Sequence, residues 1–468
     1  MTERACTHAS VRPGLDRPPS ATASRRSVSA RSTALTAALA TLGALGIAVS
    51  PVGSGTASAL EVTPRPESGS VVLEGRGFGH GRGMSQWGAY GAADAGLTWQ
   101  DILDFYYPGT QRVSIGDGTI RVLLSADTDG DTTVLPAPGL RVTFGRTVVS
   151  LPAGPAYTAW RAVRYPNGVT LQHRDAAGAW KPWRSFRMSS GSLVFRTTDG
   201  IVRVVLPGGG QQDVRGPLMA TINGSRLQTV LSSSMESYLR SVVPSEMPSS
   251  WHVEALAAQS VAARTYAAAY RDRQRAKGAT WDICDTITCQ VFKGVARYSR
   301  TGTKTVEEDA RADAAIAATR GVVMRTSSKP NAPYAFAEFS ASNGGFSVAG
   351  GPAYQVAKAD PFDGRMKNPN NGWTKPVAVT TLEQKFGLGQ LIDIRIVQRD
   401  GRGELGGRVQ DVQLTGTTRA VTVSGTKIRQ VLSLRSDWFV VKPVPVPEPP
   451  TEPVTPVTPA GRKPVAKR

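Results

Sequence analysis

The segment from Met235 to Arg271 reads MESYLRSVVPSEMPSSWHVEALAAQSVAARTYAAAYR, and the rest of the chain is best interpreted around it. Its first half is polar and turn-rich around Glu246, whereas its second half is rich in alanine. The apolar residues of the second half recur at helical spacing, at Val253, Leu256, Ala257, Val261 and Ala268. The segment predicts a central helix, with Glu246 placed just before its start.

Glu246 is the first candidate for chemistry. Its neighbours Met247, Pro248 and Trp251 are apolar and disfavour a charged carboxylate, which raises the pKa of such a group and suits it to act as a general acid. The alternative is a solvated carboxylate that complements the positive end of the helix dipole.

Length and composition indicate a folded, strongly basic chain. The 468 residues correspond to one large or two ordinary domains with tails, and an apolar content of 40% supports a folded core. The formal charge is +19 and the pI is about 10.2. In a cytosolic protein this charge would first suggest nucleic acid, which predicts clustered Lys and Arg with interleaved aromatic residues. The charge here is dispersed, so nucleic acid is not expected as a partner.

Residues 1–59 have the pattern of a signal peptide. A polar region with six arginines precedes the uncharged run 33–49, and Ala57-Ser58-Ala59 is a small-residue cleavage site. The pair Arg25-Arg26 hints at twin-arginine export, and an uncleaved anchor is the alternative. Removing six positive and two negative side chains lowers the charge from +19 to +15. We expect a secreted or wall-located protein with no membrane contact beyond this peptide.

Two of the three cysteines remain after such cleavage. Cys6 lies in the leader, so Cys284 and Cys289 form an even pair in an oxidising compartment. A local disulfide is expected, with free thiols or a metal as alternatives. A zinc site would need two more ligands, and neither His nor Cys lies close by in the sequence, so no metal is expected.

A glycine-rich segment follows the predicted strand at residues 71–73. It reads GRGFGHGRGMSQWGAYGAADAG from Gly75, and its glycines indicate unusual dihedrals or the close approach of another group. No register gives a dinucleotide-binding or phosphate-loop spacing, so no cofactor is expected. His80 is a candidate site residue, a core histidine or a turn residue. Residues 84–95 and 97–107 predict two helices.

The rest of the chain alternates between short strands and single helices. Residues 119–206 predict strands, and they contain Trp160, Trp180 and Trp183, which can pack in a core or stack on sugar rings. A helix is expected at 305–319, and strands at 321–325, 334–339, 391–398 and 407–414. The loop 340–347 reads SASNGGFS and suits either a tight turn or the close approach of a polar ligand.

We therefore expect an α+β fold, namely a β-rich mixed domain built around one central helix with an additional β-rich subdomain. The predicted order is a spacer at 60–70, the glycine-rich segment at 71–118, a β-rich segment at 119–235 and the core with the central helix at 236–441. The proline-rich basic tail at 442–468 is expected to be extended and disordered.

Three segments together resemble the stage II sporulation protein D/LytB amidase-enhancer family of bacterial cell-wall proteins. They are GRGFGHGRGMSQWGAYGAADAGLTWQDILDFYYPGT, VVPSEMPSSWHVEALAAQSVAARTYAAAY, and CDTITCQVF with FSASNGG. The resemblance covers roughly residues 70–440. In the sporulation protein the glycine-histidine motif lies near the C-terminal end, whereas here it precedes the EMP segment. The motif order is therefore that of a circular permutation, which would place residues 421–439 beside the strand at Val71.

The resemblance implies lytic transglycosylase activity, which cleaves the bond between N-acetylmuramic acid and N-acetylglucosamine in peptidoglycan. It also implies that Glu246, the acid of the EMP motif, is the catalytic group. Some family members bind zinc near the cysteine loop through two histidines, but here Thr288 precedes the second cysteine and no histidine is adjacent. The enhancer half of the family name implies the alternative, a non-catalytic glycan-binding activator of an N-acetylmuramoyl-L-alanine amidase.

The residues around Glu246 favour chemistry with a single carboxyl group. Ordinary glycosidases need two carboxylates, and the nearest acids in the sequence, Glu236 and Glu254, are not clearly placed to assist. In a lytic transglycosylase the 6-hydroxyl of the muramic acid attacks its own anomeric carbon, so one carboxyl group can donate and then accept the proton.

The remaining candidates support this group. Substrate-binding donors and acceptors are expected on the two loops, at His80, Ser85, Gln86, Ser340, Ser342 and Asn343. Gln259 and Arg264 are expected to be buried hydrogen-bond partners that hold the loops. The predicted partners are peptidoglycan glycan strands, an amidase and anionic wall polymers.

Overall fold

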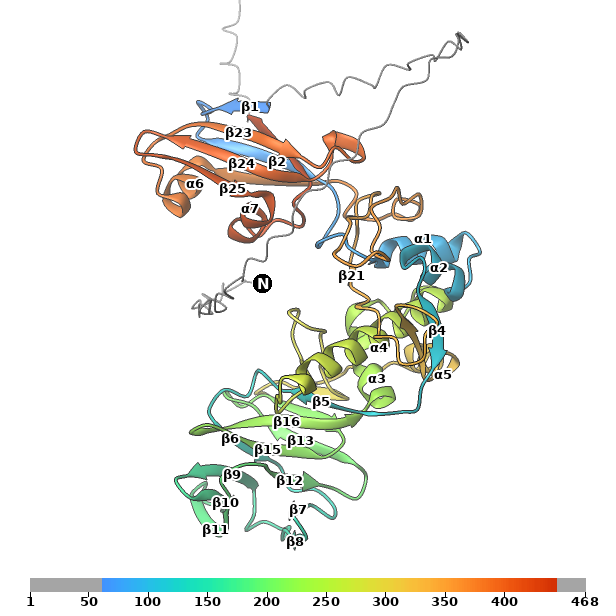
Figure 1. The fold of residues 1–468 in the computed structure, drawn as a ribbon. Helices are drawn as coiled ribbons and strands as arrows, with labels where there is room; N and C mark the ends of the chain where they lie inside the picture. The colour runs from blue at the N-terminus through green and yellow to red at the C-terminus, as the bar shows by residue number, and fades with distance from the viewer. Residues whose placement is uncertain (1–60, 444–468) are drawn as a thin grey trace, which may run out of the picture. The chain divides into compact units, whose positions relative to one another are not determined.

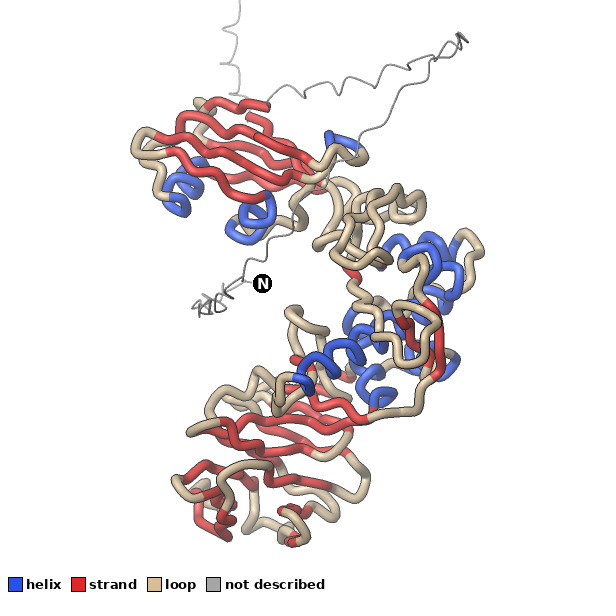
Figure 2. Tube along the Cα trace, in the orientation of Figure 1, coloured by secondary structure: helices blue, strands red, loops and turns tan. Residues whose placement is uncertain are grey.

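The computed structural model describes residues 61–443 and has the expected α+β, β-rich architecture (Figures 1 and 2). The predicted signal peptide and the proline-rich tail beyond residue 443 lie outside the described residues. Among the residues 61–443, every helix is too short or too polar to cross a membrane.

The central helix is confirmed as α4 (Val253–Ala276), which is 24 residues long and buried along most of its length. His252 caps its N-terminus, and the His252 side chain accepts a hydrogen bond from the Glu254 amide. The other expected helices are also present, as α1 (Gln86–Asp94), α2 (Trp99–Tyr106) and α5 (Ala310–Ala318).

Of the helices that were not expected, α3 bears on the site. α3 (Met235–Glu246) occupies the segment predicted to be turn-rich, so Glu246 lies at the end of a helix and not just before one. The side chain of Ser234 caps α3, and Tyr238, Leu239, Val242 and Val243 are buried along it. Pro244 lies inside the helix, in its last turn.

Two sheets contain the strands predicted at 119–206, together with strands from residues 211–306. The eight-stranded sheet has the order β11-β10-β9-β6-β13-β14-β18-β19, and the seven-stranded sheet has the order β17-β5-β16-β15-β12-β7-β8. Their strands are β5 (Thr119–Leu123), β6 (Asp131–Val134), β7 (Arg141–Phe144), β8 (Thr147–Ser150), β9 (Ala159–Tyr165), β10 (Gly168–Arg174), β11 (Trp180–Arg187), β12 (Ser192–Arg196), β13 (Ile201–Val205), β14 (Gln211–Arg215), β15 (Leu218–Asn223), β16 (Arg226–Ser234), β17 (Ile283–Cys284), β18 (Ala296–Tyr298) and β19 (Lys304–Val306).

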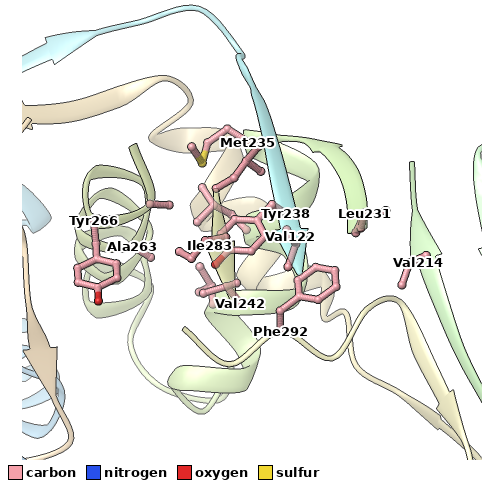
Figure 3. Close-up of a cluster of buried hydrophobic side chains, with 14 of the residues drawn as sticks. Val122, Val214, Leu231, Met235, Tyr238, Val242, Ala263, Tyr266, Ile283 and Phe292 are labelled. Atoms are coloured by element: carbon pink, nitrogen blue, oxygen red, sulfur yellow. The ribbon is translucent and has the colours of Figure 1, made fainter. Parts of the chain in front are cut away.

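The helices and these two sheets share one hydrophobic core. Tyr238 and Val242 of α3 lie between α4, which contributes Ala263, and the strand that carries Val122 (Figure 3). Because α3 is packed on several sides, the position of its last residue, Glu246, is determined by the core.

A second core joins the two ends of the described chain. Its strands are β1 (Glu61–Pro64), β2 (Ser70–Gly75), β22 (Trp373–Ala378), β23 (Leu391–Arg399), β24 (Val409–Gly416), β25 (Ala420–Ser424) and β26 (Phe439–Pro443), with the helices α6 (Val379–Phe386), η1 (Glu404–Gly406) and α7 (Gly425–Val431). β2 pairs with both β22 and β26, and Val71 shares its core with Ile428 and Leu432. The expected proximity of residues 421–439 to the strand at Val71 is confirmed.

Short strands connect the glycine-rich segment to the later loop. β3 (Met84–Ser85) pairs in parallel with β21 (Phe339–Ser340), and β4 (Gln111–Ser114) pairs with β20 (Val322–Arg325). The prediction of a strand at 334–339 was therefore wrong for most of its length. Gly83 has φ +63°, and a Cβ atom there would lie 1.9 Å from the carbonyl oxygen of Glu338. The close approach expected of this segment is thus made by a backbone 255 residues away.

Candidate active site

A cavity of about 290 Å³ contains Glu246 and His80. The two residues come from distant parts of the chain, since His80 lies on the glycine-rich segment and Glu246 at the end of α3. The other lining residues are Arg82, Tyr266, Glu338, Phe339 and four residues of the cysteine loop, Ile287, Thr288, Cys289 and Val291.

The carboxyl group of Glu246 is half-buried and has one short hydrogen bond. The backbone N–H of Val291 donates to its Oε1 at 2.7 Å. Burial raises the pKa of Glu246 above its usual value, while the Val291 hydrogen bond and the nearby charge of Lys293 act in the opposite direction. The position of Glu246 at the C-terminal end of α3 also disfavours a negative charge. The site therefore favours a carboxyl group that carries a proton more readily than an exposed glutamate does.

Gln86 links the glycine-rich segment to the backbone of Glu246. Its Nε2 donates to the Glu246 carbonyl oxygen at 2.9 Å and to Oε1 of Gln259 at 3.4 Å. Gln86 and Gln259 are both buried, and Nε2 of Gln259 has no hydrogen-bond partner among residues 61–443. Neither residue lines the cavity, so the structure places both behind Glu246.

His80 faces the same cavity as an uncharged ring. The Arg82 backbone N–H donates to its Nδ1 at 3.0 Å, so the neutral ring carries its proton on Nε2. Burial first, and then the charge of Arg82, lower the pKa of His80 to about 4. His80 is therefore neutral near pH 7 and can donate a hydrogen bond to a polar ligand.

Glu338 is a second carboxylate in the cavity, and the sequence reasoning missed it. Arg82 donates to both of its oxygens, from Nε at 3.0 Å and from Nη2 at 2.7 Å, and Gln355 donates at 3.0 Å. Burial alone would raise the pKa of Glu338, but the hydrogen bonds and charge of Arg82 outweigh it and lower the pKa. Glu338 lies two residues before Ser340 in the sequence. Its position next to the predicted loop is the feature that could have identified it as a site residue.

Three of the predicted substrate-binding residues lie in a buried network. Ser85 and Ser342 both donate from their hydroxyl groups to Asp363, the latter at 2.8 Å. Nδ2 of Asn343 donates to Asp360 at 2.6 Å. All three side chains are fully buried and none lines the cavity, so the structure places them where they join the loop 340–347 to the start of α1.

Ser340 is the remaining loop candidate. It is buried, and its hydroxyl oxygen has no hydrogen-bond partner among the described residues. Of the six residues predicted to bind substrate, His80 is therefore the one that lines the cavity.

Arg264 is fully buried and pairs with Glu236. Its Nε and Nη2 donate to the two carboxylate oxygens at 2.8 and 2.7 Å, and its Nη1 donates to the Val322 carbonyl at 3.1 Å. Glu254 accepts a 2.7 Å hydrogen bond from the Trp99 amide at the start of α2. Both acids considered in the sequence as partners for Glu246 are therefore engaged elsewhere.

The expected disulfide between Cys284 and Cys289 is present, with Cα atoms 5.5 Å apart. Two sulfur atoms bonded to each other are not available as thiolate ligands, and among the described residues no group of three or more His, Cys, Asp or Glu could hold a metal ion. The residues present in this loop do not fit the zinc site that some family members have.

These features define a class of protein: an α+β domain in which a half-buried glutamic acid and a neutral histidine line the same polar cavity. Residues 223–325, which include α3 and α4, match the family SpoIID, described as "Stage II sporulation protein". The match covers the part of the chain that carries Glu246 and the central helix, and it is similarity over about a fifth of the 468 residues.

Three relatives show how much of the chain is shared. The protein named "Amidase enhancer" from Bacillus subtilis (strain 168) is 36% identical over 153 residues, which is 31% of this chain and 18% of that protein. "Stage II sporulation protein D" from the same strain is 29% identical over 235 residues, or 48% and 63% of the two chains. The protein of the same name from Bacillus amyloliquefaciens is 29% identical over 243 residues, or 49% and 65%. The chain thus covers less than two thirds of each relative.

Proposed function

We propose that the protein is an exported cell-wall enzyme, a lytic transglycosylase that cleaves peptidoglycan glycan strands. The observation that carries the proposal is a carboxyl group with a raised pKa, Glu246, in a polar cavity whose other residues include a neutral histidine. The names of the relatives support a role in sporulation or in amidase function.

Glu246 starts the reaction protonated. It donates this proton to the glycosidic oxygen as the bond between that oxygen and the anomeric carbon of the muramic acid breaks. The 6-hydroxyl of the same sugar bonds to that carbon, and its proton passes to the Glu246 carboxylate. The products are a 1,6-anhydro sugar and a strand ending in a free 4-hydroxyl, and Glu246 is protonated again.

The other cavity residues have separate roles in this proposal. The negative charge of Glu338 stabilises the positive charge that develops at the anomeric carbon. Both of its oxygens accept hydrogen bonds from Arg82, which makes Glu338 a poor nucleophile. His80 donates a hydrogen bond from Nε2 to a sugar hydroxyl or an N-acetyl oxygen.

The test is a product analysis with glycan strands stripped of their stem peptides by an amidase. The wild-type chain should release anhydro-muramyl products, and Glu246→Gln should release none because its amide cannot supply the proton. Glu67→Gln, an exposed residue outside the cavity, is the matched control and should retain full activity. Products with reducing ends would contradict the transglycosylase mechanism.

A second candidate function has one specific observation in its favour. The relative with 36% identity is named "Amidase enhancer". In that case the cavity binds glycan without cutting it, and solubilisation of the wall appears only when an N-acetylmuramoyl-L-alanine amidase is added. Glu246→Gln would then leave the enhancement unchanged, so the same variant distinguishes the two functions.

A further inference from the structure

The edge of the eight-stranded sheet carries a concentration of positive charge. β9, β10 and β11 are its last three strands, and among residues 61–443 β11 pairs only with β10. Residues 157–187 contain one acid, Asp175, and six cations: Arg161, Arg164, Arg174, Lys181, Arg184 and Arg187. We call this region the β9–β11 surface.

Most of this charge is not neutralised within the described chain. Arg161 lies 3.5 Å from Asp131, and Lys181 lies 2.9 Å from Asp175. Arg164 and Arg174 donate to backbone carbonyl groups, which carry no net charge. Within residues 61–443 no salt bridge joins Arg164, Arg174, Arg184 or Arg187 to a carboxylate, so four cations retain their charge.

An exposed tryptophan, Trp183, lies on the edge strand β11, which also carries Lys181, Arg184 and Arg187. The pairing of β10 with β11 shifts register between Leu171 and Gln172, which face Arg184 and Pro182, so Trp183 is the extra residue of a β-bulge. Bulges at sheet edges commonly redirect a side chain. The residues from Lys181 to Ser185 are all exposed, and 41% of the surface of Trp183 is accessible.

The ring of Trp183 is nevertheless held by three other rings. The centroids of Trp160, His173 and Tyr157 lie 5.3, 5.7 and 5.8 Å from it, each in an edge-to-face arrangement. Edge-to-face aromatic packing is favourable and orients the ring. The indole is therefore a preformed apolar platform, and a ligand that binds it does not need to order it first.

Charges on an edge strand also have a structural explanation, because they discourage pairing with another sheet. That explanation accounts for the charges of Lys181 and Arg184, and Pro182 has the same effect because it lacks a backbone N–H. It does not account for a large aromatic side chain that is rigidly supported and yet exposed on the same strand, since an exposed apolar ring favours the association that the charges would prevent.

We propose that the β9–β11 surface binds an anionic, sugar-containing polymer of the cell wall. The free guanidinium groups pair with phosphodiester or carboxylate groups along the polymer, and the Trp183 indole packs against the apolar face of a sugar ring. This surface is separate from the cavity that contains Glu246, and it would hold the protein on the wall irrespective of whether the cavity cuts glycan.

The experiment measures sedimentation of the full chain with purified Gram-positive walls, before and after hydrofluoric acid removes their phosphodiester-linked polymers. Binding to soluble poly(glycerol phosphate) that carries glucosyl groups on its glycerol units, and to the same polymer without them, is measured at several salt concentrations. We expect binding to untreated walls and to poly(glycerol phosphate), and at least about tenfold weaker binding to the treated walls. Equal binding to both wall preparations would overturn the proposal.

Variants then test the residues. Trp183→Ala should weaken binding to the glucosylated poly(glycerol phosphate) by about tenfold, a loss typical of one stacking contact, whereas Trp183→Phe should retain most of it. Arg184→Gln with Arg187→Gln should reduce the slope of log affinity against log salt by about two. The matched control is Arg300→Gln with Arg311→Gln, two exposed arginines outside this surface. If the Trp183→Ala variant and the double variant of Arg184 and Arg187 both bind like the control, the proposal is wrong.

Two further measurements keep the outcomes distinct. Thermal unfolding of each variant shows whether lost binding follows from lost folding, and Trp183→Phe provides a folded comparison. Glu246→Gln should bind the polymer as the wild type does. Retained binding with no glycan cleavage by the wild type would therefore reject the proposed enzymatic function while supporting this surface.

Discussion

The backbone amide of Val291 lies 2.7 Å from Oε1 of Glu246, two residues after the disulfide between Cys284 and Cys289 closes its loop. The loop therefore contributes both the wall of the cavity and the hydrogen bond that limits the rise in the pKa of Glu246. The cysteines, which are joined in a disulfide, are thereby linked to the candidate catalytic group.

Replacing both cysteines tests this link. Cys284→Ser with Cys289→Ser should lower the free energy of unfolding by about 2 kcal/mol, the chain-entropy value for a short loop. It should also lower kcat and raise the pKa of Glu246, because a less constrained Val291 amide stabilises the carboxylate less. Denaturant unfolding and a pH–rate profile measure the two effects. Unchanged activity and an unchanged profile would show that the disulfide does not position Val291.

The activity should depend on pH through Glu246. The proposed mechanism needs its protonated form, so the rate should fall as the pH rises through the pKa. Because burial raises this pKa, the fall should occur at a higher pH than an ordinary glutamic acid would give. The charge of Lys293 lowers the pKa, so Lys293→Gln should move the fall to still higher pH.

The measurement is kcat/KM on amidase-treated glycan across the pH range. Lys277→Gln, which removes an exposed cation at the end of α4, is the control and should leave the profile in place. A shift of the Lys293→Gln profile toward lower pH would contradict the assigned electrostatics.

Glu338→Gln separates a one-carboxyl from a two-carboxyl mechanism. If Glu338 only stabilises charge, the variant should lose about 10- to 100-fold in kcat and still release anhydro products. If Glu338 is instead the nucleophile or base of a hydrolase, nearly all activity should disappear, and the wild-type products should have reducing ends. Mass spectrometry of the released fragments distinguishes the two outcomes.

The buried pair of Arg264 and Glu236 should be important for stability. Arg264→Met leaves the Glu236 carboxylate without its partner in the core, which costs about 3–5 kcal/mol. The double variant Arg264→Met with Glu236→Leu removes both charges and should recover part of this loss. Urea unfolding monitored by circular dichroism gives the values. A single variant as stable as the wild type would show that the pair contributes little.

Much of the local structure was predictable because the relevant signals are periodic and short-range. The helical spacing of Val253 to Ala268 predicted α4, and alternating residues in 119–206 predicted the strands. The segment ending at Glu246 was misjudged because Pro244 and several serines read as turn signals. Burial of Tyr238, Val242 and their neighbours outweighs these weak local preferences.

What the sequence by itself determined was most of the elements and the disulfide between cysteines five residues apart, and the motif made Glu246 the candidate catalytic group. Only the tertiary structure decided which side chains line the cavity together with Glu246. Glu338 and Arg82 are separated by 256 residues in the sequence. Ser85 was expected to bind substrate, but its side chain is buried and donates a hydrogen bond to Asp363. Local patterns record which face of an element is buried, whereas the partners of a site depend on how distant elements pack.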